Sequence, residues 1–357
     1  MIWFPRRTAG THILGALMSH VKGSLFGLAF GDALGAPTEF LPYDEVVRRY
    51  GPRGPRELPT PALVTDDTQM TLAVADALLS AMESPPLTAE RLEPRLRGRF
   101  LYWWDSPEND RAPGHTCMAA CEAMARGIPW RQATIEGSKG CGANMRVAPV
   151  GLVPGPSDEQ RAGAAQLQAA MTHGHPTGLA ASELTAYAIQ QLSAGLPIVD
   201  LPEALRERCV SQRTVYHEDW LGDLWKRPGE TEPETFIARG WDECRAAFDG
   251  LEDALRQIGP DADPCSAMGA GWVAEEALAT AVYCLLLFPD EPVSAVARAA
   301  ASSGDSDSIA SLTGGFAGAA LGADAWPADW YERIEYESEL TRIAEAYGGS
   351  RGRIPLQ

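Results

Sequence analysis

Two short stretches of the sequence, TDDT and GDSDS, place several side-chain oxygens within a few residues of one another. Their oxygen-bearing residues include Thr65, Asp66, Asp67, Asp305, Asp307 and Ser308. Each stretch precedes a run of apolar residues at helical spacing, so each is expected at the first turn of a helix. There, one carboxylate or hydroxyl can cap the helix by accepting hydrogen bonds from free backbone N–H groups. One cap accounts for one residue of each stretch and leaves the other acids unexplained.

A metal centre is the alternative interpretation of the same acids. The stretch GLAFGDALGAPTEF, at residues 27–40, adds Asp32 and Glu39. Acidic clusters brought together in a dry core would repel one another, and a divalent cation removes that repulsion. Because the ligands are all oxygens, the pattern indicates a hard ion, Mg²⁺ or Mn²⁺, rather than zinc. Spacing alone does not decide between a helix cap and a metal centre.

A third stretch, GSKGCGANMRVAPVGL at residues 137–152, is rich in glycine. A glycine-rich turn that enters a helix exposes backbone N–H groups, which can bind a phosphate. A structural turn is the more frequent role of such a loop, and the stretch lacks the GxxxxGK(S/T) motif of a P-loop. His173, in THGHP, can cap a helix or contact a ligand. Trp272 can pack against the protein or stack on a base or sugar.

Helices are expected to position these residues. Apolar residues recur at three- and four-residue steps in the stretches 71–83, 162–174, 179–195, 273–288 and 308–322. Strand-like alternation is scarce, so the sequence predicts one all-α domain, at residues 18–349. Residues 1–17 are expected to be an N-terminal extension, either disordered or an arm that binds a partner, and residues 350–357 a C-terminal tail. The polar stretch 206–233 is expected to be a surface excursion.

Charge and cysteine content limit the partners and the compartment. The chain of 357 residues has a formal net charge of −18, which disfavours binding to nucleic acid or to an anionic membrane. No apolar stretch approaches the roughly 20 residues that a membrane span needs. The seven cysteines are odd in number and include no CxxC pair. They favour reduced thiols in a cytoplasmic protein over a disulfide framework.

Taken together and in order, these motifs resemble those of the ADP-ribosylglycohydrolase family, the relatives of dinitrogenase reductase-activating glycohydrolase. The resemblance runs from Lys22 to Gly322 and rests on GSLFGLAFGDALGAPTEF, TDDTQMTLAVADALL, GCGANMRVAPVGL, THGHP, GWVAEEALATAVYCLL and SGDSDSIASLTGGFAGA. It implies an all-α fold with a binuclear metal centre. It also implies cleavage of the glycosidic bond between ADP-ribose and a modified group, often an arginine side chain of a protein.

Carried over residue by residue, the resemblance implies two Mg²⁺ ions, for which Mn²⁺ can substitute. One ion would be held by Thr65, Asp66, Asp67 and Asp307. The other would be held by Glu39, Asp305, Asp307 and Ser308, so that Asp307 bridges the two. One of three carboxylates, Glu39, Asp66 or Asp67, would take the proton of the attacking water. The residues implied in binding ADP-ribose are Ser138, Lys139, Gly140, Cys141, Gly142, Asn144, His173 and Trp272.

Three positions depart from the family's pattern. Ser308 replaces the usual Thr and keeps a hydroxyl, and Ser303 replaces a Gly. Cys141 stands where Asn is common, which removes an amide contact to the ligand and affects substrate preference. Because the main ligands are present, we expect an active hydrolase that acts on ADP-ribosylated protein. The alternatives are an immunity-type hydrolase that also blocks an ADP-ribosyltransferase toxin, a binuclear phosphoesterase, and a non-catalytic binder of ADP-ribose.

Overall fold

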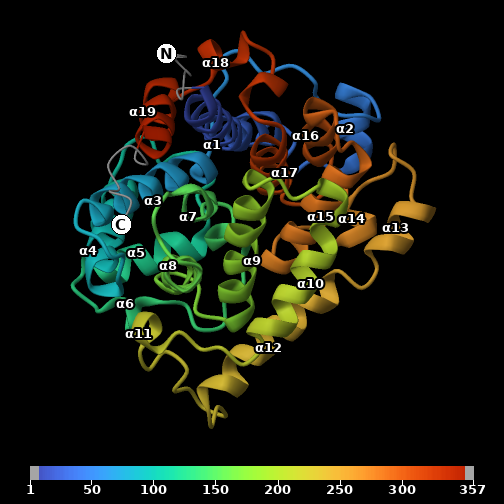
Figure 1. Ribbon diagram of the computed structural model, residues 1–357. Helices are drawn as coiled ribbons and strands as arrows, with labels where there is room; N and C mark the ends of the chain where they lie inside the picture. Colours follow the sequence, from blue (N-terminus) through green and yellow to red (C-terminus); the bar gives the residue numbers. More distant parts are fainter. Residues whose placement is uncertain (1–7, 350–357) are drawn as a thin grey trace, which may run out of the picture.

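Helices form almost all of the regular structure, as the sequence predicts. The computed structural model describes residues 8–349, and the only strand-like pairings within them are three isolated bridges. The helices, with the short 3-10 turns η1–η3, are α1 (Thr8–Gly35), α2 (Tyr43–Tyr50), α3 (Asp66–Met82), α4 (Ala89–Trp104), α5 (His115–Ala125), α6 (Trp130–Ala133), η1 (Cys141–Ala143), α7 (Ala148–Leu152), α8 (Asp158–Ala170), α9 (Pro176–Ser193), η2 (Ile198–Asp200), α10 (Leu201–Gln212), α11 (Glu218–Leu221), α12 (Pro233–Ala247), α13 (Leu251–Gln257), α14 (Cys265–Met268), α15 (Ala274–Leu287), α16 (Pro292–Ala300), α17 (Ser306–Leu321), η3 (Ala323–Ala325), α18 (Trp330–Arg333) and α19 (Glu337–Gly349). Figure 1 shows them gathered into one body.

The five helices predicted from apolar periodicity are confirmed as α3, α8, α9, α15 and α17, each of which overlaps its predicted range. α3 begins at Asp66 and α17 begins at Ser306. Both acidic stretches therefore lie at helix N-termini, where the sequence placed them.

A row of glycines lets α1 and α17 pack with their backbones in contact. The row consists of Gly23, Gly27, Gly31 and Gly35, one residue per helical turn. A Cβ at Gly31 would lie 2.1 Å from the carbonyl oxygen of Ala310, and one at Gly35 would lie 2.4 Å from Cα of Asp307. Only glycine permits such an approach. The two helices run side by side (Figure 1), which places the end of α1 against the start of α17.

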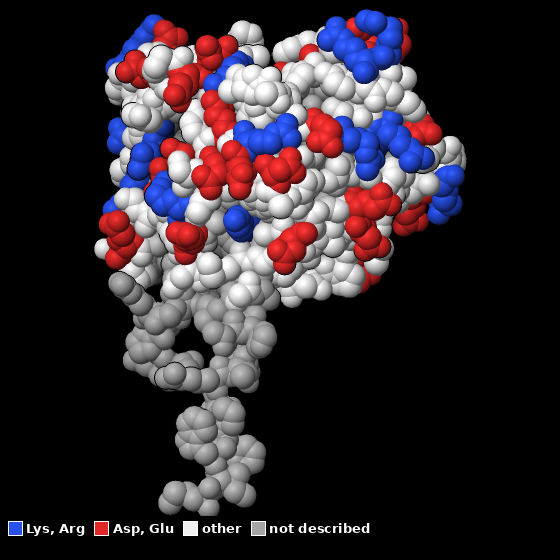
Figure 2. Space-filling view, turned by 90° about the horizontal axis from the view of Figure 1, so that it is seen from above, with Lys and Arg blue, Asp and Glu red and all other residues white. Residues whose placement is uncertain are grey.

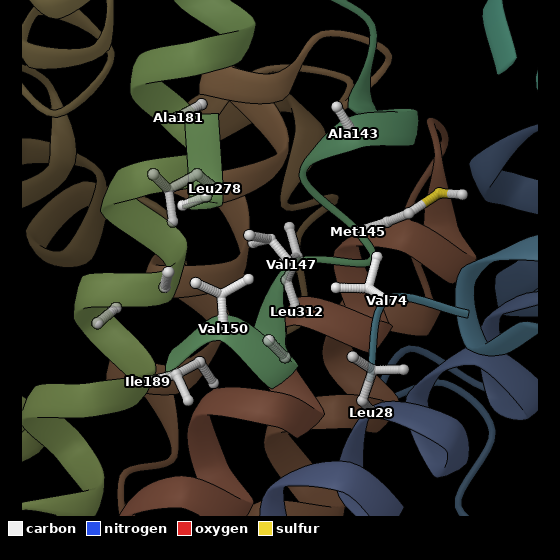
Figure 3. Close-up of a cluster of buried hydrophobic side chains, with 14 of the residues drawn as sticks. Leu28, Val74, Ala143, Met145, Val147, Val150, Ala181, Ile189, Leu278 and Leu312 are labelled. Atoms are coloured by element: carbon white, nitrogen blue, oxygen red, sulfur yellow. The ribbon is translucent and has the colours of Figure 1, made fainter. Parts of the chain in front are cut away.

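The main core lies where α1, α3, α7, α9, α15 and α17 meet. Figure 3 shows apolar side chains from these helices pointing toward one another, among them Leu28, Val74, Val150, Ile189, Leu278 and Leu312. Met145 and Val147 extend this cluster along the chain that links η1 to α7. The loop that carries the glycine-rich stretch is thus anchored in the core at its C-terminal end.

Most residues of the stretch 206–233 are exposed or half-buried, in keeping with the predicted surface excursion, and a few are buried. Trp220 and Leu221 are buried, and the indole of Trp220 packs on α8 at Gly163, where a Cβ would lie 2.3 Å from the ring. Nη2 of Arg208 lies 2.8 Å from Oε1 of buried Glu183. These buried side chains attach the stretch to α8 and α9.

The predicted terminal boundaries fall only partly within the described residues. α1 starts at Thr8, so the backbone is helical across the boundary predicted at residue 18. Residues 1–7 of the predicted N-terminal extension, and all of the tail at 350–357, lie outside the described residues. Over residues 8–349, no helix has both the length and the apolar character that a bilayer span requires.

Candidate metal centre and ligand cavity

Asp32 ties the end of α1 to the start of α3. Its buried carboxylate accepts hydrogen bonds from the backbone N–H and the hydroxyl of Thr65, both at 2.9 Å to Oδ1. It also accepts the N–H of Thr68 at 3.0 Å and its hydroxyl at 2.6 Å. Burial, followed by the charge of Asp307, raises the pKa of Asp32 to about 7. The sequence pattern groups Asp32 with Glu39 among the candidate acids, but the resemblance gives Asp32 no place in either set of metal ligands.

The first turn of α3 presents Thr65, Asp66 and Asp67. Thr65 is the N-cap, and its Oγ1 accepts the N–H of Asp67 at 3.3 Å, so the capping interpretation holds for this residue. Oδ2 of Asp66 accepts the N–H of Gly114 at 3.1 Å, a contact from the loop before α5. Asp67 is buried, and its Oδ1 has no hydrogen-bond partner among the described residues. Capping therefore leaves both aspartates unexplained.

The first turn of α17 presents the other acids. Asp305 occupies the N-cap position, but its side chain makes no capping hydrogen bond. Its backbone N–H instead donates to the carbonyl of Ala270 at 2.8 Å. Oδ1 of Asp307 accepts the N–H of Ser308 at 2.9 Å. Helix capping consequently does not account for the carboxylate of Asp305.

The two helix starts and the segment after α1 converge. Oγ1 of Thr65 lies 3.4 Å from Oδ2 of Asp307, and Oγ of Ser308 lies 3.4 Å from Oδ2 of Asp67. Glu39, Asp305 and Asp307 each offer a carboxylate oxygen, and these three atoms lie within 4.8 Å of one another. The structure thus brings together the predicted ligands Glu39, Thr65, Asp66, Asp67, Asp305, Asp307 and Ser308.

Burial and mutual repulsion raise the pKa values of these carboxyl groups. Loss of solvent, and then the charge of Asp307, raises the pKa of Asp66 to about 7 and that of Glu39 to about 9. The same two causes, in the same order, hold the pKa of Asp67 and of Asp305 well above the usual carboxyl range. Protons stabilise this arrangement when no other positive charge is present.

The donor set fits divalent cations. No lysine or arginine of the described chain lines the cavity beside these acids, so no side chain neutralises them there. The unpartnered Oδ1 of Asp67 and the uncapped carboxylate of Asp305 are available as ligands. Carboxylate and hydroxyl oxygens are the donors that Mg²⁺ and Mn²⁺ prefer. We refer to the seven converging residues as the acidic centre.

The acidic centre forms one wall of a cavity of about 710 Å³. A second wall is the glycine-rich loop Gly140–Gly142, and a third is the segment 112–118, which belongs to none of the predicted motifs. The N–H of Cys141 donates to the carbonyl of Trp272 at 3.2 Å, which fixes the loop beside the start of α15. A Cβ at Gly142 would lie 3.0 Å from Sγ of Cys117 and 3.2 Å from Cε1 of His173. The glycine therefore lets the loop backbone pack directly against these two side chains.

Two aromatic rings lie at the exposed side of the cavity. Phe40 and Trp272 are 66% and 44% exposed, and their rings stack with centroids 5.7 Å apart and an angle of 19° between planes. Both residues line the cavity. Exposed aromatic pairs of this kind offer a flat apolar surface on which a ligand ring can stack.

Three residues predicted to bind ligand lie outside the cavity wall. Nζ of Lys139 lies 2.9 Å from Oε2 of Glu243 and also bonds to Glu275, so two carboxylates already neutralise it. These pairings do not support the contact with ADP-ribose that the resemblance implies for Lys139. Asn144 is buried, and its Nδ2 donates to the Ala274 carbonyl at 3.3 Å.

The third, Ser138, lies next to the wall without forming it. Its Oγ is 2.9 Å from Oγ1 of Thr116, which does line the cavity. Ser138 therefore supports the wall through Thr116. The remaining predicted ligand-binding residues, Gly140, Cys141, Gly142, His173 and Trp272, all line the cavity.

The sequence pattern of the ADP-ribosylglycohydrolase family matches residues 15–354 of the chain. The chain belongs to the ADP-ribosylglycohydrolase family. A solved structure described as an ADP-ribosylglycohydrolase-related protein complex superposes with a TM-score of 0.65 at 24% identity, over 94% of this chain and 99% of that one. This likeness shows that the all-α fold is shared with the ADP-ribosylglycohydrolase family's structural relatives.

Named relatives within the ADP-ribosylglycohydrolase family are distant in sequence. ADP-ribosylarginine hydrolase Tri1 of Serratia proteamaculans (strain 568) is 27% identical, over 92% of this chain and 78% of the relative. Human ADP-ribosylhydrolase ARH3 is 26% identical, over 92% of this chain and 93% of the relative. Both alignments extend over the acidic centre and the cavity, and family membership supports a glycohydrolase activity in general.

Proposed function

We propose that this protein is a Mg²⁺-dependent hydrolase that removes ADP-ribose from modified arginine side chains of proteins. One observation carries the proposal: carboxylates from three separate segments converge, without a cationic side chain, on a cavity that has a glycine-rich wall. The similarity to an ADP-ribosylarginine hydrolase supports arginine as the linkage. Cations held by the acids, and backbone N–H groups of the loop, would offset the charge of the diphosphate.

The acidic centre would hold two ions. In the proposed arrangement, one ion is held by Thr65, Asp66, Asp67 and Asp307. The other is held by Glu39, Asp305, Asp307 and Ser308. Bound Mg²⁺ would supply positive charge that polarises the ribose hydroxyls and acidifies a nearby water. Asp32 takes no part as a ligand, because its lone pairs accept hydrogen bonds from Thr65 and Thr68.

The chain's own groups would supply proton transfer and orientation. Glu39 and Asp66 both line the cavity, so a carboxylate of either residue could accept a proton from the attacking water. Cleavage of the bond at the ribose carbon develops oxocarbenium character, which neighbouring carboxylates stabilise. Trp272, stacked on Phe40, would contact the adenosine end of the substrate.

Product analysis tests this proposal. Wild-type protein would be incubated with arginine-ADP-ribosylated protein and, separately, with serine-ADP-ribosylated protein, and the products separated by chromatography. We expect intact ADP-ribose from the arginine conjugate. Release of inorganic phosphate or AMP would instead show a phosphoesterase. Release from serine alone would contradict the arginine assignment, and binding without any product would show a non-catalytic binder.

A further inference from the structure

A buried arginine lies behind the cavity wall. Arg146 is 0% exposed and follows the glycine-rich loop. Its Nε donates to Oε1 of Gln168 at 2.8 Å, and its Nη2 donates to the carbonyl of Gln168 at 2.7 Å and to Oγ1 of Thr172 at 2.9 Å. The guanidinium also lies 4.4 Å from the ring centroid of Phe100. A guanidinium has donors only, so Oγ1 of Thr172 must be the acceptor in its contact with Arg146.

The hydroxyl proton of Thr172 then has two nitrogen or oxygen acceptors nearby, and the sulfur of Cys117 is a weaker third one. Nδ1 of His173 lies 2.8 Å from Oγ1, and the carbonyl oxygen of Ala169 lies 3.4 Å away. That carbonyl already accepts the backbone N–H groups of Thr172 at 3.0 Å and of His173 at 2.8 Å. Its two lone pairs are thus in use, and Nδ1 is also the nearer acceptor. Donation from Arg146 further polarises the hydroxyl, which makes it a better donor.

A donated hydroxyl at Nδ1 requires the ring proton to lie on Nε2. Burial, and then the charge of Arg146, lowers the pKa of His173 to about 3, so the ring carries a single proton at neutral pH. The Nε2 edge faces the glycine-rich loop: a Cβ at Gly140 or at Gly142 would lie 3.4 Å from Nε2. His173 lines the cavity there.

We propose that Arg146 and Thr172 are positioning residues that hold His173 as the tautomer protonated on Nε2, and that this N–H donates to an anionic oxygen of the substrate. The ligand part of this inference rests on the proposed function, whereas the tautomer does not. We call the chain of hydrogen bonds from Arg146 through Thr172 to His173 the relay. It would bring the polarising effect of a buried guanidinium to a cavity whose described wall has no lysine or arginine. A neutral donor also serves this purpose without pairing with the nearby carboxylates.

Nitrogen-15 NMR of the histidine rings tests the tautomer directly. The full-length protein would be labelled at histidine and studied without ligand at pH 7, with the His173 signals assigned by their loss in His173→Gln. We expect a proton on Nε2 and none on Nδ1. Thr172→Ser, which keeps the hydroxyl, should retain this pattern, and Thr172→Val should give a mixture of tautomers. A wild-type ring protonated on Nδ1, or an unchanged Thr172→Val spectrum, would overturn the relay.

Calorimetric titration with ADP-ribose tests the donor. Gln places an N–H₂ group near the position of Nε2, whereas Leu of similar size offers none. We expect His173→Leu to weaken ADP-ribose binding by about tenfold and His173→Gln to weaken it much less, because one hydrogen bond to a charged group is lost only in the first. Equal loss in both variants, with thermal melting like that of wild type, would overturn the donor role. Failure of the wild-type protein to bind ADP-ribose would overturn the proposed ligand and leave the NMR result on the tautomer intact.

Discussion

At the scale of single residues, the carboxylates of the acidic centre destabilise the fold by themselves, which indicates a functional role rather than a structural one. Asp305 stands at a helix N-cap without capping it, and Asp67 keeps one oxygen without a partner among the described residues. Both have pKa values raised well above the usual range by burial and by Asp307. Like charges in a buried site destabilise the fold unless a counter-ion is present.

This arrangement predicts a gain of stability on removing one charge. In chelator at pH 8, Asp305→Asn should raise the free energy of unfolding by about 1–3 kcal/mol, because folding then neither buries a carboxylate nor takes up a proton at this position. Denaturant unfolding with and without Mg²⁺ measures the effect. The variant should gain less stability from Mg²⁺ than wild type does. Equal destabilisation of the variant in chelator and in Mg²⁺ would show that Asp305 has a structural role instead.

The aromatic pair at the cavity gives a second prediction for single residues. Trp272→Ala should weaken ADP-ribose binding by about 1–2 kcal/mol, because the flat surface for stacking is lost. Tyr102→Ala is the matched control, since Tyr102 is an exposed aromatic residue that does not line the cavity. Calorimetric titration compares the two variants. Similar affinities for both would exclude Trp272 as a ligand contact.

At the scale of elements, the contact between α1 and α17 positions the acidic centre. The glycine row allows the backbones to touch, so the segment that carries Glu39 lies beside the helix start that carries Asp307. Apolar periodicity predicted α17 and its acidic N-terminus, because both signals are local. It did not predict that α1 is the partner of α17, because that pairing depends on long-range packing.

Gly31→Ala should therefore be strongly destabilising. The new Cβ would lie 2.1 Å from the carbonyl oxygen of Ala310, and the helices must separate, at a cost of about 3 kcal/mol. Gly15→Ala in the same helix is the control, because its Cβ would meet nothing within 4 Å. That change should stabilise the protein by up to about 1 kcal/mol. Thermal unfolding distinguishes the two, and an equal response would contradict the close packing.

The same limit explains which parts of the site the sequence could predict. The seven residues of the acidic centre lie in short motifs with a recognisable order, and the structure brings them together. The contact of Gly114 with Asp66 joins segments that are far apart in the chain, so no local sequence pattern predicts it. The resemblance implies Lys139 in binding ADP-ribose because this residue belongs to the glycine-rich stretch. Its pairing with Glu243 and Glu275 depends on two helices whose positions the loop does not encode.

At the scale of the whole molecule, the net negative charge affects how an anionic substrate reaches the cavity. Figure 2 shows acidic and basic side chains intermingled over one face, although the net charge of the chain is −18. An anionic substrate is therefore not attracted by overall charge and needs donors within the cavity.

All seven cysteines are free thiols, as the sequence predicted; the cytoplasmic location remains a prediction.

The stability of the whole chain should depend on pH in a way that Mg²⁺ changes. A carboxyl whose pKa is raised in the folded state contributes stability at low pH, and this is lost as pH rises through the folded value. For Asp66 that value is about 7 and for Glu39 about 9. In chelator, the free energy of unfolding should fall by about 2 kcal/mol or more between pH 5.5 and 8.5.

Saturating Mg²⁺ should reverse most of this loss, because the cation replaces the protons and binds only the folded centre. Thermal melting across this pH range, with chelator and with Mg²⁺, provides the comparison. A chelated protein that becomes more stable as pH rises from 5.5 to 8.5 would be inconsistent with the raised pKa values.

The most direct test of the central claim is the rate of ADP-ribose release from arginine-ADP-ribosylated protein as Mg²⁺ is restored to chelator-treated enzyme. Wild type and Asp305→Asn/Asp307→Asn would be compared, with thermal melting to confirm that both are folded. We predict no release in chelator, recovery with Mg²⁺ in wild type, and no recovery in the double variant. Full release in chelator, or from the folded double variant, would contradict the assignment of these acids as the metal centre of a hydrolase.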